Sequence, residues 1–303
     1  MFESTYRELL DPAVLSRLGN LPLFARKPML GNVSGRHRSP HRGSSVEFAE
    51  YRKYVAGDDP RRLDWRAYAR SDRYYIKEFE ADTNLRLCVV LDTSGSMRYK
   101  WGDGETKLSY GKKMAATLGH LAVKQGDAFG ISCAAAKIGT EIPPKRSPAH
   151  LRNIYKTLME TEARGETGMV DALHSVAEQV AQRALVVVIS DLFVPPEQLS
   201  ECFQHLRFRK HDIAVFHLLE NQELEFDFDR PTRFVDLEGG SPLLVEPIAI
   251  RRQYQAALKE YFEGLDAAVR DSAVDYHRIQ IDEPYGDVLG RFLIGRKPRR
   301  ART

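Results

Sequence analysis

Short apolar runs alternate with segments of helical periodicity along most of the chain. Uninterrupted apolar runs indicate strands that are buried on both faces, and we expect such strands at residues 85–91, 128–134, 184–190 and 213–219. Between and after these runs, apolar side chains recur every three or four residues, which is typical of amphipathic helices. We expect these helices near residues 108–121, 151–161, 170–184, 195–206 and 251–269.

This alternation of strands and helices predicts the fold class. Strand–helix–strand units form parallel sheets with helices on both faces, because their crossover connections are right-handed. We therefore expect an α/β fold with a doubly wound, mostly parallel sheet, which residues 276–281 could close. In such sheets, ligands bind beyond the carboxyl ends of the strands. The residues that directly follow the predicted strands are therefore the candidates for a binding site.

Three regions differ in composition. Residues 1–84 form an N-terminal segment that contains a basic stretch at 26–42, and we expect this segment to pack on the sheet domain because its many aromatic side chains need burial. Residues 85–290 carry the alternating pattern and are expected to form the α/β domain. Residues 291–303 are basic and are expected to form a solvated C-terminal tail.

Composition narrows the classes of function only slightly. The formal net charge of +3 is mild and does not by itself indicate a nucleic-acid partner. The three cysteines are odd in number and widely spaced, which argues against a disulfide framework or a zinc cluster. The N-terminus lacks the apolar core of a signal peptide, and no stretch approaches the roughly 18 apolar residues of a membrane helix. We therefore expect a cytoplasmic protein without a membrane span.

Two of the predicted strands are followed by an aspartate. Asp92 begins the loop Asp92-Thr93-Ser94-Gly95-Ser96, Asp191 follows a later strand, and Thr167 precedes a helix between them. In a doubly wound sheet these segments can meet at one edge, where they offer oxygen ligands from Asp92, Ser94, Ser96, Thr167 and Asp191. Hard cations prefer such ligands, Mg²⁺ foremost and Mn²⁺ or Ca²⁺ as alternatives. Two carboxylates at most leave the ion electrophilic, so it can accept a carboxylate from another protein.

The plainer interpretation of residues 92–96 is a strand-to-helix turn with a helix cap, since Ser and Asp are common at helix N-termini. The presence of Thr167 and Asp191 at the expected strand ends favours the metal site. The arginines near residue 65 could form a surface that binds phosphate or a partner. The plainer interpretation is that they pair with neighbouring aspartates.

The five oxygen ligands match a known pattern. Asp92-x-Ser94-x-Ser96, with a downstream threonine and a later aspartate, resembles the metal-ion-dependent adhesion site (MIDAS) of von Willebrand factor A domains. The resemblance implies that all five residues are metal ligands, directly or through water, and that the ion binds an acidic residue of a partner protein. The sequence has Glu166 and Leu192 where many relatives have glycine, and neither change removes a ligand.

A second resemblance spans residues 44–293. The segment from Glu47 to Arg70, which includes Gly57-Asp58-Asp59 and Asp64-Trp65, is similar to the signature of the bacterial domain-of-unknown-function 58 family, where it precedes an A-type domain. Members of that family are often encoded beside MoxR-type AAA+ ATPases. The resemblance therefore implies an adaptor or partner of such an ATPase.

Two other classes of function stay open from the sequence. A Mg²⁺-dependent hydrolase or phosphoryl-transfer enzyme could use Asp92, but the chain has Asp92-Thr93-Ser94 in place of Asp-x-Asp and lacks phosphate-loop and nucleophile-elbow motifs. A nucleic-acid-binding protein could use the basic residues at 26–42 and in the tail, and its binding would depend on salt and not on metal. No nucleic-acid recognition motif is evident in the sequence. We therefore predict a metal-dependent protein-binding module that is not an enzyme.

Overall fold

The computed structural model describes residues 6–25, 47–54, 63–71, 73–80, 85–134 and 138–296. The chain divides into two compact units, of which one comprises Met1–Arg26 with Arg86–Thr303 and the other comprises Lys27–Leu85. We call the first the sheet unit and the second the small unit.

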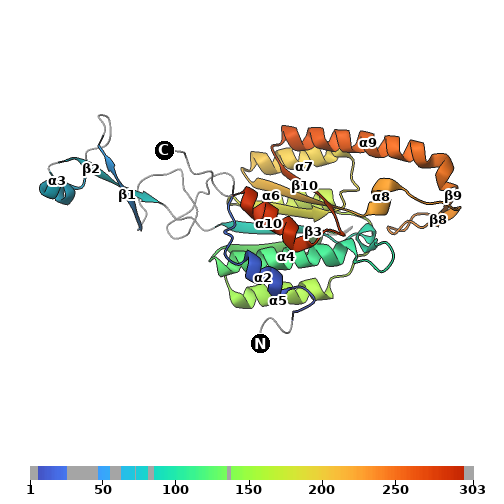
Figure 1. Ribbon diagram of the computed structural model, residues 1–303, viewed down its shortest axis with the longest axis horizontal. Coiled ribbons are helices and arrows are strands. Elements are labelled where there is room, and N and C mark those ends of the chain that lie inside the picture. Colours follow the sequence, from blue (N-terminus) through green and yellow to red (C-terminus); the bar gives the residue numbers. More distant parts are fainter. Residues whose placement is uncertain are drawn as a thin grey trace. The chain divides into compact units, whose positions relative to one another are not determined.

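A six-stranded sheet forms the centre of the sheet unit (Figure 1). Its strand order is β10-β7-β6-β3-β4-β5. Its strands are β3 (Arg86–Asp92), β4 (Ala128–Ala134), β5 (Ile138–Lys145), β6 (Leu185–Ser190), β7 (Asp212–Leu219) and β10 (Asp275–Gln280). Neighbouring strands pair in parallel, except that β5 runs antiparallel to β4. The predicted α/β fold with a mostly parallel sheet is therefore confirmed.

Helices cover both faces of this sheet (Figure 1). One layer contains α2 (Pro12–Leu18), α4 (Lys107–Lys124), α5 (Pro148–Glu160) and α10 (Tyr285–Gly295), and the other contains α6 (Met169–Gln179), α7 (Pro196–Phe208) and α9 (Pro247–Asp271). Alternate strand residues face the two layers. Val186 and Val188 belong to the core under α6 and α7, whereas Leu91 and Ile189 approach α4. All are fully buried, as expected for strands covered on both faces.

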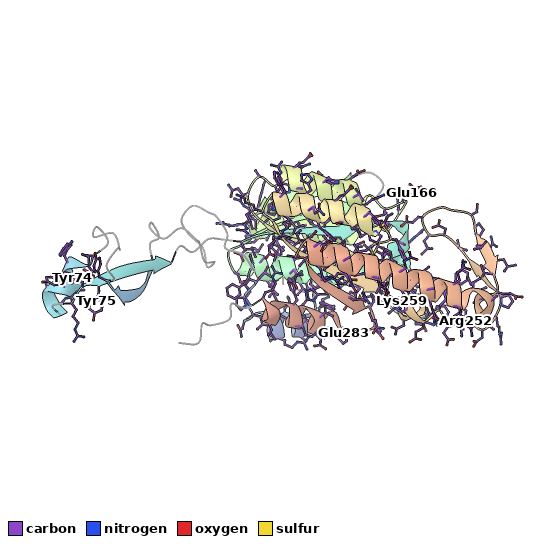
Figure 2. All side chains as sticks on the ribbon, turned by 90° about the horizontal axis from the view of Figure 1, so that it is seen from above. Tyr74, Tyr75, Glu166, Arg252, Lys259 and Glu283 are labelled. Atoms are coloured by element: carbon purple, nitrogen blue, oxygen red, sulfur yellow. The ribbon has the colours of Figure 1, made fainter. Side chains whose placement is uncertain are left out.

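Local sequence explains where several helices begin. The Thr106 side chain accepts a hydrogen bond from the backbone N–H of Ser109 and so caps α4, and Ser147 does the same for α5. Helices α5, α7 and α9 each have proline in the first turn, where no backbone donor is lost. The outer face of α9 is polar, and Figure 2 labels Arg252 and Lys259 on it. None of the helices in the described ranges has the length and apolar character needed to cross a membrane.

The boundaries of the sheet unit differ from those expected after residues 84 and 290. Helix α2 packs against α4 and α10, and the backbone N–H of Leu23 donates to the Gln125 side chain at 2.9 Å. Helix α10 continues to Gly295, and the buried Arg296 pairs with Asp212 and Asp275. The structure therefore groups part of the N-terminal segment and the first residues of the expected tail with the sheet unit. Residues 297–303 lie outside the described part of the chain.

Among its described residues, the small unit contains two paired strands and one helix. Strands β1 (Glu47–Lys53) and β2 (Tyr75–Glu80) pair antiparallel, and α3 (Trp65–Ser71) lies between them in sequence. The rings of Tyr68 and Tyr74 stack at 4.6 Å, so some of the aromatic side chains of this segment pack against one another. The basic stretch at 26–42 lies outside the described residues.

Candidate metal centre

The carboxyl ends of β3 and β6 lie side by side, because the two strands are parallel neighbours with Leu91 opposite Ile189. Asp92 is the last residue of β3 and Asp191 directly follows β6. Both residues are buried, with 1% and 2% of their surface exposed. Burial, and then the charge of Asp191, raise the pKa of Asp92 to about 7.

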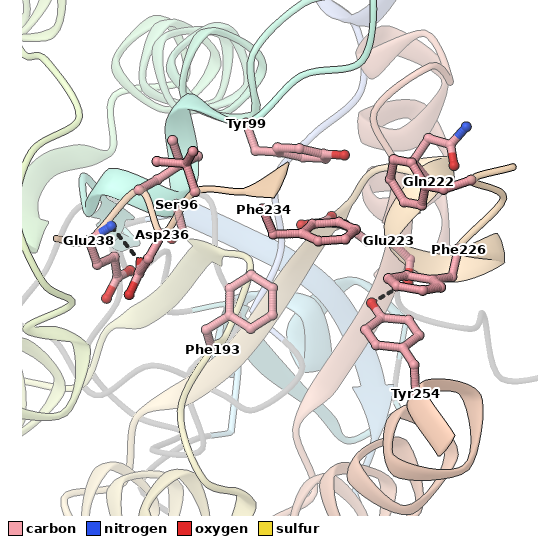
Figure 3. A pocket seen from close by; sticks show the side chains of 13 residues that line it. Ser96, Tyr99, Phe193, Gln222, Glu223, Phe226, Phe234, Asp236, Glu238 and Tyr254 are labelled. Carbon is pink, nitrogen blue, oxygen red and sulfur yellow. Dashed lines mark hydrogen bonds between the residues drawn. The ribbon is translucent and has the colours of Figure 1, made fainter. Parts of the chain in front are cut away.

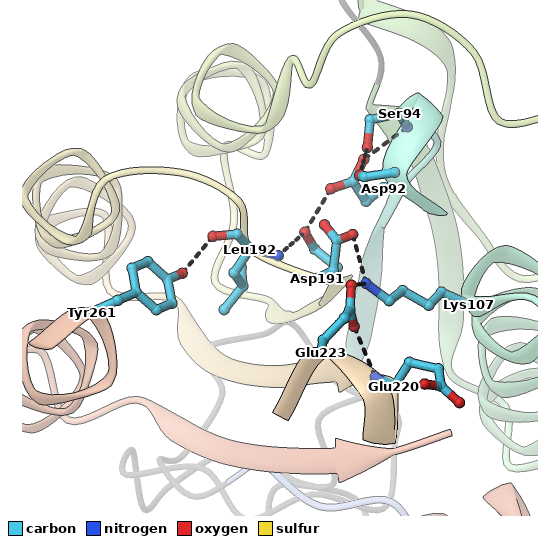
Figure 4. Close-up of polar contacts among 10 residues, drawn as sticks. Asp92, Ser94, Lys107, Asp191, Leu192, Glu220, Glu223 and Tyr261 are labelled. Carbon is cyan, nitrogen blue, oxygen red and sulfur yellow. Dashed lines mark hydrogen bonds and ion pairs between the residues drawn. The ribbon is translucent and has the colours of Figure 1, made fainter. Parts of the chain in front are cut away.

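The loop of residues 92–96 folds around the Asp92 carboxylate (Figure 4). The backbone N–H of Ser94 donates to Asp92 Oδ1 at 2.9 Å, and the hydroxyl of Ser190 donates to Asp92 Oδ2 at 2.6 Å. The hydroxyls of Ser94 and Ser96 are hydrogen-bonded to each other, with their oxygens 2.9 Å apart. Ser96 belongs to the short 3₁₀ helix η2 (Gly95–Arg98) and keeps part of its surface exposed. The loop therefore presents a carboxylate and two hydroxyls within one small volume.

The segment that carries Thr167 is hydrogen-bonded to this loop. The backbone N–H of Gly95 donates to the Gly165 carbonyl, and the backbone N–H of Arg164 donates to the Thr93 carbonyl, both at 2.8 Å. Thr167 then precedes α6, and its hydroxyl accepts from the backbone N–H of Met169 at 3.4 Å. All three predicted segments thus meet at one edge of the sheet. Asp92, Ser94 and Ser96 are joined by direct contacts, whereas Asp191 and Thr167 flank them.

A buried lysine that sequence reasoning missed lies beside Asp191. Lys107, at the start of α4, places its ammonium 3.1 Å from Asp191 and 2.6 Å from Glu223 of α8 (Asn221–Glu225) (Figure 4). Burial opposes the charged form, but the two carboxylates raise the pKa of Lys107 above its usual range. The ammonium therefore neutralises negative charge at Asp191. The hydrogen-bond donors to Asp92, the Ser94 N–H and the Ser190 hydroxyl, are by contrast uncharged.

The donor set fits a small hard cation. Mg²⁺ binds oxygen at about 2.0–2.1 Å in an octahedron, which separates adjacent ligand atoms by about 2.9 Å, and this is the spacing of the Ser94 and Ser96 hydroxyls. Within the described residues, no group of three or more His, Cys, Asp or Glu side chains is placed to hold a metal. A metal at this edge would therefore rely on hydroxyl oxygens, as the sequence predicts.

Leu192, which directly follows Asp191, has an unusual backbone conformation. Its φ is +54°, in the left-handed region that side chains other than glycine rarely adopt. The strain is tolerated because the leucine side chain is fully buried and its backbone N–H donates to the Ser190 hydroxyl at 2.8 Å. The loop that positions Asp191 thus accommodates a leucine in the left-handed region.

An aromatic cavity of about 400 Å³ adjoins Ser96 (Figure 3). Part of its wall comes from a hairpin formed by β8 (Thr232–Phe234) and β9 (Leu243–Val245). The aromatic residues that line the cavity are Tyr99, Phe193, Phe226, Phe228, Phe234 and Tyr254. Tyr99 therefore lies beside Ser96 at the rim of the candidate centre.

Comparison with known proteins identifies the family. The model of the family described as "Protein of unknown function DUF58" matches residues 50–263. The chain belongs to the DUF58 family. Relatives of this DUF58 protein include the uncharacterized proteins Rv1480 and MT1527 of two Mycobacterium tuberculosis strains. Each is 23% identical over 292 residues, which cover 95% of this chain and 91% of the relative.

Solved structures also resemble the DUF58 protein. An aerotolerance-related membrane protein from Bacteroides fragilis and BatB from Bacteroides thetaiotaomicron each align with a TM-score of 0.45, at 13% and 15% identity. They cover 70% of this chain and 100% and 98% of their own. The SpRpn10 VWA domain aligns with a TM-score of 0.43 at 13% identity, covering 71% of this chain and 96% of its own.

Proposed function

We propose that this DUF58 protein is a non-catalytic protein-binding module that uses a divalent metal ion, Mg²⁺ foremost, to hold an acidic residue of its partner. The proposed ligands, direct or through water, are Asp92, Ser94, Ser96, Thr167 and Asp191. The observation that carries the proposal is the pair of hydroxyls 2.9 Å apart beside the buried Asp92 carboxylate. Hydroxyls are neutral ligands, so the ion would keep enough positive charge to attract a carboxylate.

The cavity beside Ser96 supports a protein as the partner. Aromatic side chains line it, and Phe193 and Trp101 near it are about half exposed. Interfaces between proteins gain most of their affinity from apolar anchors that fill such pockets. A partner segment with an acidic residue next to an apolar side chain would match both the metal centre and the cavity.

We further propose a MoxR-type AAA+ ATPase as that partner, with the DUF58 protein as its adaptor. This part of the proposal rests on the resemblance to the family and on no residue in the sheet unit.

Capture of the purified MoxR-type ATPase of the same bacterium tests the proposal. The immobilised DUF58 protein should retain the ATPase in Mg²⁺ and release it in EDTA. The Asp92→Ala variant should not retain it, whereas Asp103→Ala, which changes an exposed acid in the loop after η2, should behave as the wild type. Capture that persists in EDTA and in Asp92→Ala would contradict the metal-dependent mechanism.

The same preparations separate the other two classes of function. Phosphatase activity that requires Mg²⁺ and is lost in Asp92→Ala would favour a hydrolase. Nucleic-acid binding that weakens steeply with salt and ignores EDTA would favour the basic stretches of the chain.

A further inference from the structure

The turn between β8 and β9 lies directly on the loop of residues 92–96, which we call the metal loop. A Cβ atom added to Gly95 would stand 2.0 Å from the Leu237 carbonyl oxygen and 3.3 Å from Glu238 Cα, so the turn backbone leaves no room for a side chain there. Arg98 of η2 also donates a hydrogen bond to the Leu237 carbonyl at 3.1 Å. The hairpin and the metal loop are therefore packed backbone to backbone.

Glu238 extends from this turn to the segment that carries Thr167. Its Oε2 accepts a hydrogen bond from the backbone N–H of Thr167 at 3.4 Å. Its Oε1 is buried and has no hydrogen-bond partner among the residues that the structure describes. A buried carboxylate oxygen without a partner is costly, and a cation next to it removes that cost.

The turn holds Glu238 in this position by its own hydrogen bonds. The carboxylate of Asp236 accepts a hydrogen bond from the backbone N–H of Glu238 at 2.8 Å (Figure 3). It also accepts one from the backbone N–H of Gly240 at 3.1 Å. Gly239 between them has a φ of +112°, which favours glycine. Asp236 is thus engaged in shaping the turn, and Glu223, the other acid that lines the cavity, is paired with Lys107. Glu238 is the acid that the turn presents to the metal loop.

We propose that Glu238 is a built-in carboxylate ligand of the metal centre and occupies the position that a partner's acidic residue takes. This inference rests on the proposed function, since it requires a metal at this edge of the sheet. A partner then binds by displacing Glu238. Because Phe234, Val235 and Leu237 of the same hairpin line the aromatic cavity, displacement of the turn also widens the cavity for the partner's apolar side chain.

Mn²⁺ alone is a sufficient probe, because its paramagnetism reports both its affinity and the number of water molecules on the ion. The test compares the wild type, Glu238→Gln, Glu166→Gln and Asp92→Asn by titration with Mn²⁺ and by water-proton relaxation. Glu238→Gln should bind Mn²⁺ roughly 10-fold more weakly, as expected for the loss of one group that supports the ion. The bound ion should carry more water in this variant than in the wild type. Added acetate should displace water more readily from Glu238→Gln.

The other two variants separate the possible causes. Glu166 is an exposed acid one residue from Thr167, so Glu166→Gln controls for the loss of one nearby negative charge and should match the wild type. Equal affinity and equal hydration in Glu238→Gln and the wild type would overturn the inference and leave the proposed function standing, provided that Asp92→Asn binds no Mn²⁺. Failure of the wild type itself to bind Mn²⁺ would overturn both.

Discussion

Lys107 joins two carboxylates in the interior of the protein. Its side chain is fully buried, and those of Asp191 and Glu223 are 1% and 15% exposed. Replacing one member of a buried ion pair is more damaging than losing an exposed pair, because an uncompensated charge stays behind in a poorly solvated place. The lysine therefore fixes the charge balance of the edge on which the candidate metal centre lies.

The Lys107→Met variant should be strongly destabilised. Methionine has a similar length but no charge, so Asp191 and Glu223 lose their common partner, and we expect a loss of about 3–5 kcal/mol in the free energy of unfolding. Lys259→Met is the control, because Lys259 forms an exposed pair with Glu263 at 3.8 Å and should cost less than about 1 kcal/mol. Urea unfolding measures both. Equal, small effects would show that Lys107 is not needed to balance these carboxylates.

His217 should make stability depend on pH. Burial, and then the charges of Lys107 and Arg278, lower the pKa of His217 from 6.5 to about 3. Below pH 6.5 the unfolded chain therefore binds a proton that the folded protein does not, so this part of the stability is complete above pH 6.5 and is lost as pH falls toward 3. His211, whose pKa burial lowers to about 4, acts in the same direction.

His217→Asn removes the larger of these two contributions. Between pH 6.5 and pH 5, the wild type should lose about 2 kcal/mol more of its free energy of unfolding than the variant does. Urea titrations at the two pH values measure this difference. Parallel losses in the two proteins would mean that His217 is not the source of the acid sensitivity.

Sequence reasoning found the carboxylates and hydroxyls of the candidate centre but not the residues around them. Asp92 and Asp191 were visible because each follows an apolar strand, and strand ends of a parallel sheet meet at one edge. Lys107 and Glu238 lack such a signal, since their partners are 84 and 71 residues away in sequence. The one available hint for Glu238 is its place before Gly239-Gly240, a combination typical of a turn.

Among the elements, helix α4 packs closely against the sheet because it has a glycine at the contact with β4. A Cβ atom on Gly119 would stand 2.3 Å from the ring of the fully buried Phe129 on β4. Gly119→Ala should therefore destabilise the protein by about 1–3 kcal/mol through overpacking. Gly290→Ala in α10 is the control, because its Cβ would meet Leu18 at an ordinary 3.6 Å and alanine favours a helix by about 0.5–1 kcal/mol. Thermal unfolding should separate the two variants in opposite directions, and similar melting temperatures would contradict the close fit.

The elements that the sequence predicts well are those with strong apolar patterns. Strand β4 has the predicted bounds, β6 and β7 each differ by one residue at their start, and β3 is shifted by one residue at both ends. Strand β5 was missed because Pro143 and Pro144 argue against a strand, yet prolines are tolerated on an edge strand, where one side needs no hydrogen bonds. Helix α10 was missed as well, because its apolar residues stand close to the basic C-terminus.

At the scale of the whole molecule, the two ends of the chain are joined in the sheet unit. Arg296 donates to the Phe24 carbonyl at 2.8 Å and to Asp275 of β10 at 2.6 Å, and it also pairs with Asp212 of β7. No local pattern predicts contacts between residues 272 positions apart. This is why the sequence placed residues 6–24 with the rest of the N-terminal segment, whereas the structure places them with the sheet unit.

We expect a divalent metal to bind at the edge of the sheet through Asp92 and its neighbouring hydroxyls. Calorimetric titration of Mg²⁺ into the metal-free protein, in the wild type and in Asp92→Asn, tests it most directly. Asparagine keeps the shape of the side chain but not its charge, and thermal unfolding can check that the variant is folded. The wild type should bind one ion saturably, and Asp92→Asn should bind none. Absence of binding in the wild type, or equal binding in the variant, would contradict it.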